Sequence, residues 1–261
     1  MVYLTRGMEN KVKSIFDGVQ DINHVRYISH RGFQPMAPAN SLPSFEYAGL
    51  LRQWAIETDV RETKDGVLVC CHDATVDAAF NGTGAIEELT WKELSLLQMN
   101  CGNRLNCFTR EQKQMPLFTE YLAICKRFRS VPFIELKTDS VGKVLGAVRN
   151  SGLEDGQVAA SDCSLDRLIE VRRCAKDMFV HWIFGNERRL DELARLGFAG
   201  MSWKVDDPLA QSLEKIKLSH DAGLRVCLRA ADSLEAVRFM LGLGLDYLPS
   251  NCMHNLLPDE E

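Results

Sequence analysis

The sequence predicts an α/β fold, a TIM or (β/α)8 barrel with a small insertion after its second strand. Eight short apolar runs alternate with longer segments, several of which have apolar residues at helical spacing. The length of 261 residues is close to the roughly 250 that are typical of such a barrel. Polar side chains follow several of the apolar runs, at the strand ends where barrels carry their functional groups.

The eight apolar runs are the predicted strands. They cover residues 27–29, 55–60, 131–136, 157–161, 179–183, 199–203, 224–228 and 246–249. Each is short and is separated from the next by a segment long enough for a crossover connection. This pattern is typical of parallel strands and their helices.

Helical spacing marks five of the segments between the strands. They lie around residues 140–150, 165–174, 188–196, 208–222 and 234–243. In the second of these segments, Ser164 stands at the N-cap position and Leu165, Leu168 and Ile169 share one face. Glycines close several of the segments, as expected at helix C-termini.

One stretch, residues 61–115, is too long for a single crossover. It contains an Asp65-Gly66 turn followed by the apolar run "VLVCCHD", which together predict a hairpin. We expect an insertion here, carried by a single barrel domain that covers residues 1–261.

Composition narrows the class of protein. The chain is 46% hydrophobic and 26% charged with a net charge of -5, which is ordinary for a globular protein and argues against a nucleic-acid binder. The nine cysteines include no C-x-x-C pair and are expected to be reduced thiols. We expect no signal peptide, no membrane span and a cytoplasmic location.

Three carboxylates are expected to meet at the barrel mouth. Alternation along a strand puts Glu57 and Asp59 on one side, and Glu135 ends the next strand. Converging carboxylates repel unless they share a hard cation, so the set predicts one bound Mg²⁺ or Ca²⁺. The alternative is that Glu57 and Asp59 end a strand in a solvated turn.

Two histidines and two cations follow the same strand ends. His30 and His72 are candidates for a general acid/base pair, because imidazole titrates near neutral pH. Arg31 and Lys137 are candidates for binding a phosphate. Taken singly, each of the four could be a packing or solvated residue. Together with the carboxylates they describe phosphoryl transfer.

The same residues carry a resemblance to a known family. "HRGFQPMAPANSLPSFEYA", "IETDVRETKDGVLVCCHDATVDAAFNGTGAIEELTWKEL" and "FIELK" resemble, in order, three motif blocks of the glycerophosphodiester phosphodiesterases. The resemblance covers residues 28–137, a little under half of the chain, and the second half is similar only as generic βα units.

The resemblance implies a barrel enzyme that cleaves a glycerophosphodiester, a small molecule, to glycerol 3-phosphate and an alcohol. Carried over by position, His30 and His72 are the catalytic pair, and Arg31 and Lys137 bind the phosphate. The metal ligands implied are Glu57, Asp59 and Glu135. In the mechanism implied, the glycerol 2-hydroxyl attacks phosphorus and water opens the cyclic product.

The chain departs from the family pattern at several positions. Ala39 stands where the family usually has Glu, and Ser41 where it usually has Thr, while Asn40 is kept. "RVCLRAAD" lacks the usual tryptophan, and Ser250-Asn251 replaces a Thr-Asp pair. Trp203 and Lys204 are candidates for a replacement wall or an anion contact, although a packing role as an aromatic shelf is favoured for Trp203 and a solvated side chain for Lys204.

Two alternatives remain open. The same constellation serves a phosphodiesterase that acts on a lysophospholipid or another phosphodiester, in which case an exposed apolar rim is expected on residues 61–115. A barrel with a decayed site, used only for binding, is the second alternative. The head group, the choice between Mg²⁺ and Ca²⁺ and the oligomeric state are left open by the sequence.

Overall fold

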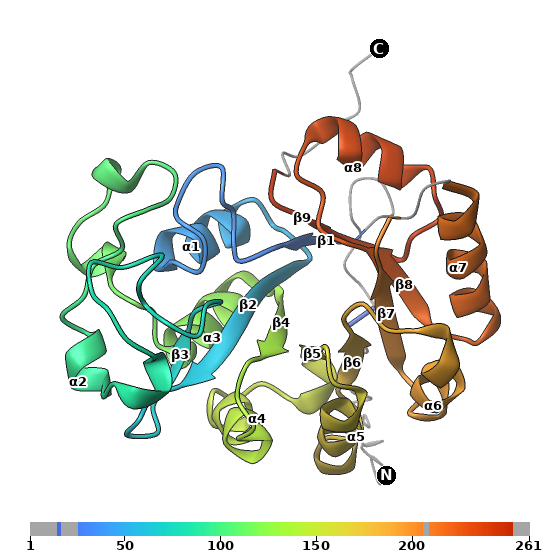
Figure 1. Cartoon of the computed structure of the whole chain (residues 1–261), viewed down its shortest axis with the longest axis horizontal. Coiled ribbons are helices and arrows are strands. Elements are labelled where there is room, and N and C mark those ends of the chain that lie inside the picture. The colour runs from blue at the N-terminus through green and yellow to red at the C-terminus, as the bar shows by residue number, and fades with distance from the viewer. Residues whose placement is uncertain (1–14, 17–25, 206–208, 253–261) are drawn as a thin grey trace, which may run out of the picture.

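The computed structural model describes residues 15–16, 26–205 and 209–252 (Figure 1). Eight parallel strands form the barrel wall, and each begins and ends within two residues of its predicted run. The strands are β1 (Arg26–Ser29), β2 (Ala55–Glu62), β4 (Val131–Leu136), β5 (Ala159–Asp162), β6 (Phe179–Trp182), β7 (Ala199–Trp203), β8 (Arg225–Leu228) and β9 (Tyr247–Ser250). The predicted TIM-type barrel is confirmed.

The expectation about a signal peptide concerns residues that lie almost wholly outside the described ranges.

The strands follow one another around the barrel in the order β8-β7-β6-β5-β4-β2-β1-β9, with every neighbouring pair parallel. The two end strands approach each other: Asp246 N donates to Val226 O at 3.0 Å, and Ala231 forms a bridge with Ser250. The circle is therefore nearly closed, and the strand ends that carry the predicted site face one common opening.

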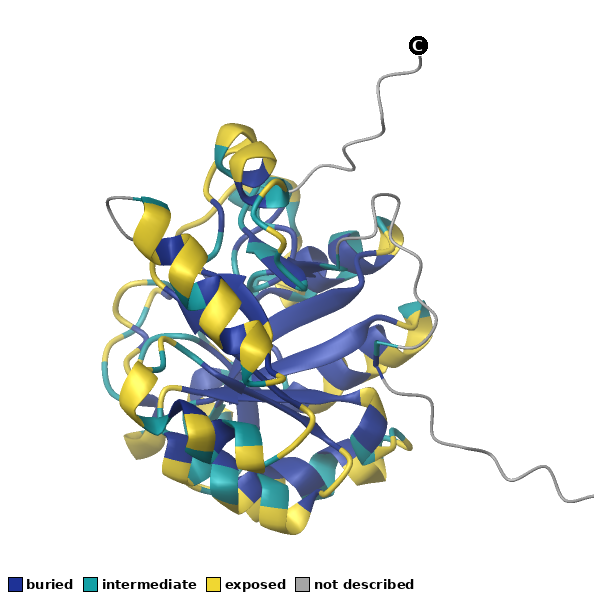
Figure 2. Cartoon of the chain, turned by 90° about the vertical axis from the view of Figure 1, so that its right-hand side faces the viewer, coloured by how far each residue is buried: buried dark blue, intermediate teal, exposed yellow. Residues whose placement is uncertain are grey.

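Helices surround the strands, with exposed outer faces over a buried sheet (Figure 2). They are α1 (Leu42–Leu50), α3 (Phe118–Phe128), α4 (Val141–Asn150), α5 (Leu165–Cys174), α6 (Leu190–Arg195), α7 (Leu209–Asp221) and α8 (Leu234–Leu241). The last five match the predicted helical segments. Helices α1 and α3 were not among those predicted, although α3 buries residues at helical spacing. Among the described helices, none is both long and apolar enough to cross a membrane.

The barrel interior is apolar at one end only. Ala55, Val131, Ala159 and Phe179 open their strands and belong to one buried cluster, closed by the ring of Tyr247. The ring centroids of Phe179 and Tyr247 are 6.0 Å apart. Because this packing fills the N-terminal end of the barrel, polar side chains can gather only towards the C-terminal end.

The insertion begins with the predicted hairpin. Strand β3 (Leu68–Cys70) runs antiparallel to β2, with Val60 opposite Cys70 and Glu62 opposite Leu68. This pairing extends β2 to Glu62, two residues beyond the expected end of the strand. The remainder holds α2 (Trp91–Leu94) and three short 3-10 helices, Ile86–Glu88, Leu105–Cys107 and Glu111–Lys113, around an apolar cluster of its own.

Candidate active site

The turn after β1 places two of the predicted residues. Arg31 and Gly32 both have positive φ values, 57° and 79°. A Cβ on Gly32 would lie 2.3 Å from Ser44 Oγ, so only glycine fits against the first turn of α1. Asn40 N donates to Arg31 O at 2.9 Å and closes the loop. The loop is held by these contacts although Ala39 offers no carboxylate.

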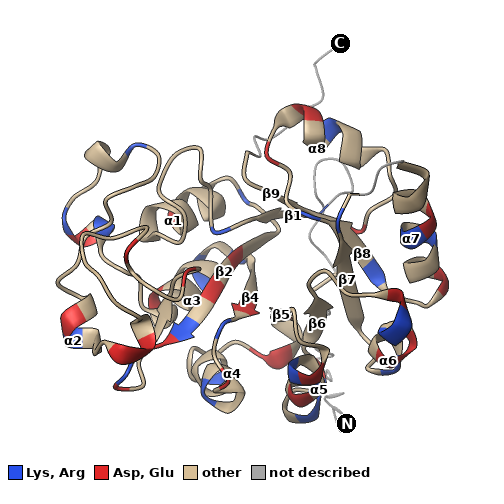
Figure 3. Ribbon diagram, viewed as in Figure 1, with Lys and Arg blue, Asp and Glu red and all other residues tan. Residues whose placement is uncertain are grey.

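The three predicted carboxylates converge. Asp59 on β2 is the register partner of Glu135 on β4, and Glu57 lies two residues earlier on the same face. Glu57, Asp59 and Glu135 each offer an oxygen, and these oxygens lie within 4.8 Å of one another. Figure 3 shows the acidic segments on the neighbouring strands β2 and β4. Glu57 and Asp59 are buried, which contradicts the alternative of a solvated turn.

Hydrogen bonds satisfy only part of the oxygens of this carboxylate cluster. Burial, and then the carboxylates of Asp59 and Glu135, raise the pKa of Glu57 well above its usual range. Burial and Asp59 likewise raise the pKa of Glu135. Glu57 Oε1 and Asp59 Oδ1 are buried without a hydrogen-bond partner. An all-oxygen set with unsatisfied lone pairs fits a hard divalent cation.

Arg31 and Lys137 border the carboxylates. The Arg31 amide donates to Glu57 Oε2 at 2.7 Å, and Arg31 Nε lies 3.4 Å from Asp59 Oδ2. Lys137 Nζ pairs with Glu135 and lies 3.7 Å from Asp59 Oδ1. Burial alone would lower the pKa of Lys137, but these two carboxylates outweigh it and raise the value. Lys137 therefore stays charged beside the acidic cluster.

Each of the two predicted histidines has its Nδ1 engaged by an oxygen. His30 Nδ1 lies 2.6 Å from Asn251 Oδ1, and its Nε2 lies 4.0 Å from Glu57 Oε2. His72 Nδ1 lies 2.8 Å from Asp73 Oδ1. Burial and the neighbouring Arg31 lower the pKa of His30, and the charge of His72 contributes to the same shift. These contacts leave Nε2 of both rings available for proton transfer.

A cavity of about 400 Å³ opens at this end of the barrel. Its lining includes every predicted site residue except Asp59, which lies buried at the carboxylate cluster: His30, Arg31, Glu57, His72, Glu135 and Lys137. Phe184, Leu228 and Arg229 contribute to the opposite wall. Trp203 does not line this cavity, because its Nε1 donates to Ser219 Oγ on α7 at 2.9 Å. The packing role that was favoured for Trp203 is the one found.

Several residues at the site were not assigned a role from the sequence. Asn40 donates to Asp59 Oδ2 at 2.9 Å and accepts from Thr58 Oγ1 at 2.8 Å. Asn251 approaches His30 from 221 residues away, a contact with no local sequence signal. His181 lines the cavity and hydrogen bonds to the Tyr247 hydroxyl at 2.5 Å.

Comparisons with known proteins show which proteins the chain is similar to. Residues 30–248 match the model of the "Glycerophosphoryl diester phosphodiesterase family". A segment of 129 residues is 33% identical to glycerophosphodiester phosphodiesterase 1 of Bos taurus, covering 47% of this chain and 38% of that protein. A segment of 70 residues is 43% identical to a glycerophosphodiester phosphodiesterase of Caldanaerobacter subterraneus, covering 27% and 29% of the two chains. The matched segments thus span well under half of these relatives.

Solved structures share the fold. A glycerophosphodiester phosphodiesterase from Agrobacterium tumefaciens superposes with a TM-score of 0.72 at 24% identity, covering 87% of this chain and 96% of the other. A phosphodiesterase from Oleispira antarctica, solved in complex with the product sn-glycerol-3-phosphate, gives a TM-score of 0.75 at 20% identity, with 87% and 93% covered.

Proposed function

Because the chain belongs to the glycerophosphoryl diester phosphodiesterase family, we propose that it hydrolyses a glycerophosphodiester to glycerol 3-phosphate and an alcohol. The convergence of Glu57, Asp59 and Glu135 beside two histidines and two cations carries this proposal. The Oleispira antarctica neighbour, which holds sn-glycerol-3-phosphate, contains the product that the reaction would release.

Glu57, Asp59 and Glu135 would hold one divalent cation, Mg²⁺ or Ca²⁺. When bound, such an ion neutralises phosphate charge and lowers the pKa of a coordinated hydroxyl. The unsatisfied oxygens of Glu57 and Asp59 support this assignment. Arg31 and Lys137 border the same cluster and would hold the phosphate oxygens, Arg31 as a forked donor and Lys137 as a point charge.

The two histidines take opposite roles in the proposal. His30 is the base, because its lowered pKa keeps it unprotonated at neutral pH, and it accepts the proton of the glycerol 2-hydroxyl as that oxygen attacks phosphorus. His72 is the acid: Asp73 holds its Nδ1, so Nε2 can give a proton to the departing alcohol. Water then opens the cyclic phosphate, with the proton transfers running in reverse.

Activity assays test the proposal directly. Purified protein is incubated with glycerophosphocholine and glycerophosphoethanolamine, with Mg²⁺, with Ca²⁺ and with a chelator. We expect turnover that the chelator abolishes, and His30→Ala and His72→Ala should each cost at least roughly 100-fold in kcat. Turnover that survives the chelator would contradict the metal assignment, and small losses in both variants would contradict the histidine roles.

The two alternatives receive less support. A lysophospholipid enzyme was expected to expose an apolar rim on the insertion. Among the large apolar residues there, only Leu96 is largely exposed, and Phe80 is buried. A decayed site is disfavoured by the presence of all seven site residues around one opening.

We further propose that residues 1–261 form one domain with 61–115 inserted, acting on a small molecule in the cytoplasm, where the nine free thiols would stay reduced.

A further inference from the structure

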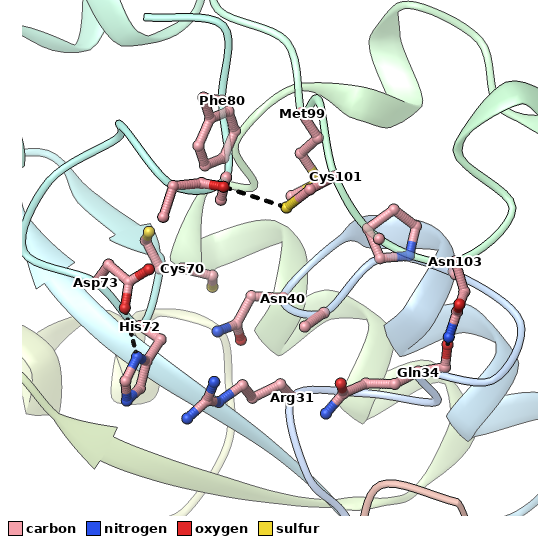
Figure 4. Close-up of a pocket in the computed structure, with 17 residues that line it drawn as sticks. Arg31, Gln34, Asn40, Cys70, His72, Asp73, Phe80, Met99, Cys101 and Asn103 are labelled. Carbon is pink, nitrogen blue, oxygen red and sulfur yellow. Dashed lines mark hydrogen bonds and ion pairs between the residues drawn. The ribbon is translucent and has the colours of Figure 1, made fainter. Parts of the chain in front are cut away.

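A second cavity lies beside the barrel mouth, between the β1–α1 loop and the insertion (Figure 4). Its volume of about 340 Å³ equals on the order of ten water molecules. Ala37 and Ala39 contribute to one wall, and Ala79, Phe80 and Met99 to the other. The cavity is thus of a size and character that suits a small, largely apolar group.

The walls are fixed to each other by contacts across the cavity's rim. Asn103 Nδ2, on the insertion, donates to the backbone oxygen of Gln34 at 2.9 Å. A Cβ on Gly102 would lie 2.7 Å from Pro38 Cβ, so the two loops touch closely at that point. The space between them is therefore part of the folded chain and needs no rearrangement to receive a ligand.

Arg31 and His72 join this second cavity to the barrel mouth. They are the two described residues that line both spaces, and Figure 4 shows them at one end of the second cavity. Glu57, Glu135 and Lys137 line the barrel mouth alone. A phosphate held by Arg31 would therefore have the carboxylates on one side and the second cavity on the other.

The geometry of in-line displacement indicates which side of the phosphate takes the attacking oxygen and which side takes the leaving oxygen. The attacking and leaving oxygens lie on opposite sides of phosphorus. The glycerol 2-oxygen forms its bond to phosphorus on the carboxylate side and loses its proton to His30. The bond from phosphorus to the alcohol oxygen breaks on the His72 side. That oxygen keeps the electron pair and takes a proton from His72, so the alcohol leaves as a neutral molecule.

We propose that the second cavity binds the leaving alcohol of the substrate, and that it takes an uncharged alcohol with a short apolar chain. The inference rests on the proposed function. Phe80 is the one described Phe, Tyr or Trp side chain in the lining of the cavity, whereas quaternary ammonium groups are recognised by cages of several such rings. The charge of Arg31 repels a cation, and the carboxylate of Asp73 is already hydrogen bonded to His72.

A matched substrate series tests the proposal. The substrates are glycerol 3-phosphate esters of methanol, of n-butanol and of choline, assayed with wild type, Ala79→Leu and Ala39→Leu. Each buried methylene is worth roughly fourfold, so wild type should favour the butyl over the methyl ester at least tenfold in kcat/KM. Filling the cavity should lower this butyl-to-methyl ratio at least tenfold. Ala123→Leu, on the outer face of α3, is the control and should leave the ratio unchanged.

A non-hydrolysable phosphonate analogue of the butyl ester separates the cavity assignment from the proposed function. Its binding is measured by calorimetry. If no ester is hydrolysed but the phosphonate binds wild type at least tenfold more tightly than Ala79→Leu, the proposed function fails and the cavity assignment stands. If all esters are hydrolysed and both filled variants keep the wild-type ratio, the cavity assignment fails and the proposed function stands. A choline ester preferred tenfold over the butyl ester would overturn the class of alcohol. Ala39→Leu serves as the second variant should Ala79→Leu not fold.

Discussion

At the scale of single residues, the carboxylate cluster lowers the folding stability of the metal-free chain and provides the ligands for a cation. Glu57 is buried beside two like charges, and burial together with this repulsion raises its pKa. A carboxyl group whose pKa is raised on folding opposes folding at every pH above its ordinary value, because the folded state must either hold a buried charge or take up a proton. Near neutral pH Glu57 therefore destabilises the chain without metal, and a bound cation would remove this penalty.

Glu57→Gln should separate these two effects. In chelator at about pH 8 the variant should be more stable than wild type by about 1 kcal/mol or more, because one like charge is gone. Its affinity for Mg²⁺ should fall at least tenfold. Urea unfolding with chelator and calorimetric titration with Mg²⁺ measure the two quantities. Glu46→Gln, which removes a partly exposed partner of Arg127, is the control. Wild-type affinity for Mg²⁺ in the Glu57→Gln variant would contradict the metal site.

Asn251 orients His30 from the end of β9. Its Oδ1 accepts from His30 Nδ1 and also from Gln34 Nε2, both at 2.6 Å. Asn251→Ala should lower kcat about 10- to 100-fold with little change in KM, because the imidazole loses its alignment. Asn251→Asp keeps the acceptor for His30 but loses the donor to Asp232 Oδ1, so it should recover only part of the rate. Asn150→Ala, on the outside of α4, is the control. A wild-type kcat in the Asn251→Ala variant would show that the contact has no positioning role.

At the scale of elements, helix α1 supports the loop that carries His30 and Arg31. Its N-cap Ser41 accepts from Ser44 N, and Ser44 Oγ in turn accepts from Ser41 N, which forms a capping box. Ser41 Oγ also donates to Pro38 O at 2.6 Å. The cap therefore joins the start of the helix to the loop that borders both cavities.

Ser41→Ala should destabilise the chain by about 1–2 kcal/mol, since the buried cap and the bond to Pro38 are both lost. It should also lower kcat/KM, because the loop shifts with the helix. Urea midpoints and steady-state kinetics check the two effects. Thr90→Ala removes a capping box from α2 in the insertion and should leave kcat/KM unchanged. Equal kinetic losses in both variants would show that α1 has no special link to the site.

At the scale of the whole molecule, closure of the barrel buries an ionisable group in its interior. His181 on β6 is buried next to the hydroxyl of Tyr247 on β9 and the ring of Phe133 on β4. Burial lowers the pKa of His181 to about 3. In the unfolded chain a histidine titrates near pH 6.5. Below that pH the unfolded state therefore binds a proton that the folded state does not bind.

This difference predicts a pH dependence of folding. The contribution of His181 to stability is complete above about pH 6.5 and is lost as the pH falls towards about 3, at up to about 1.4 kcal/mol per pH unit. Urea unfolding at about pH 7 and about pH 5 should show a shallower loss in His181→Gln than in wild type. The exposed His220→Gln is the control. Parallel curves for wild type and His181→Gln would contradict the buried neutral imidazole.

The eight strands and the convergence of the three carboxylates could be predicted from the sequence alone, because both follow from local patterns along the chain. Strand runs such as 131–136 and helices such as α5 follow from apolar periodicity, which is a property of neighbouring residues. Glu57 and Asp59 share a face because side chains alternate along any strand. The topology then brings the strand ends together, so the three carboxylates converge as predicted.

The contacts of those residues follow from the tertiary structure and could not be predicted from the sequence. The Asn251 amide reaches His30 because β9 pairs with β1, and His181 meets Tyr247 because both face the barrel interior. The second cavity exists because the insertion folds back onto the β1–α1 loop, where Asn103 bonds to Gln34. Contacts of this kind depend on how remote segments pack, and packing is fixed by the whole set of neighbours and not by local periodicity.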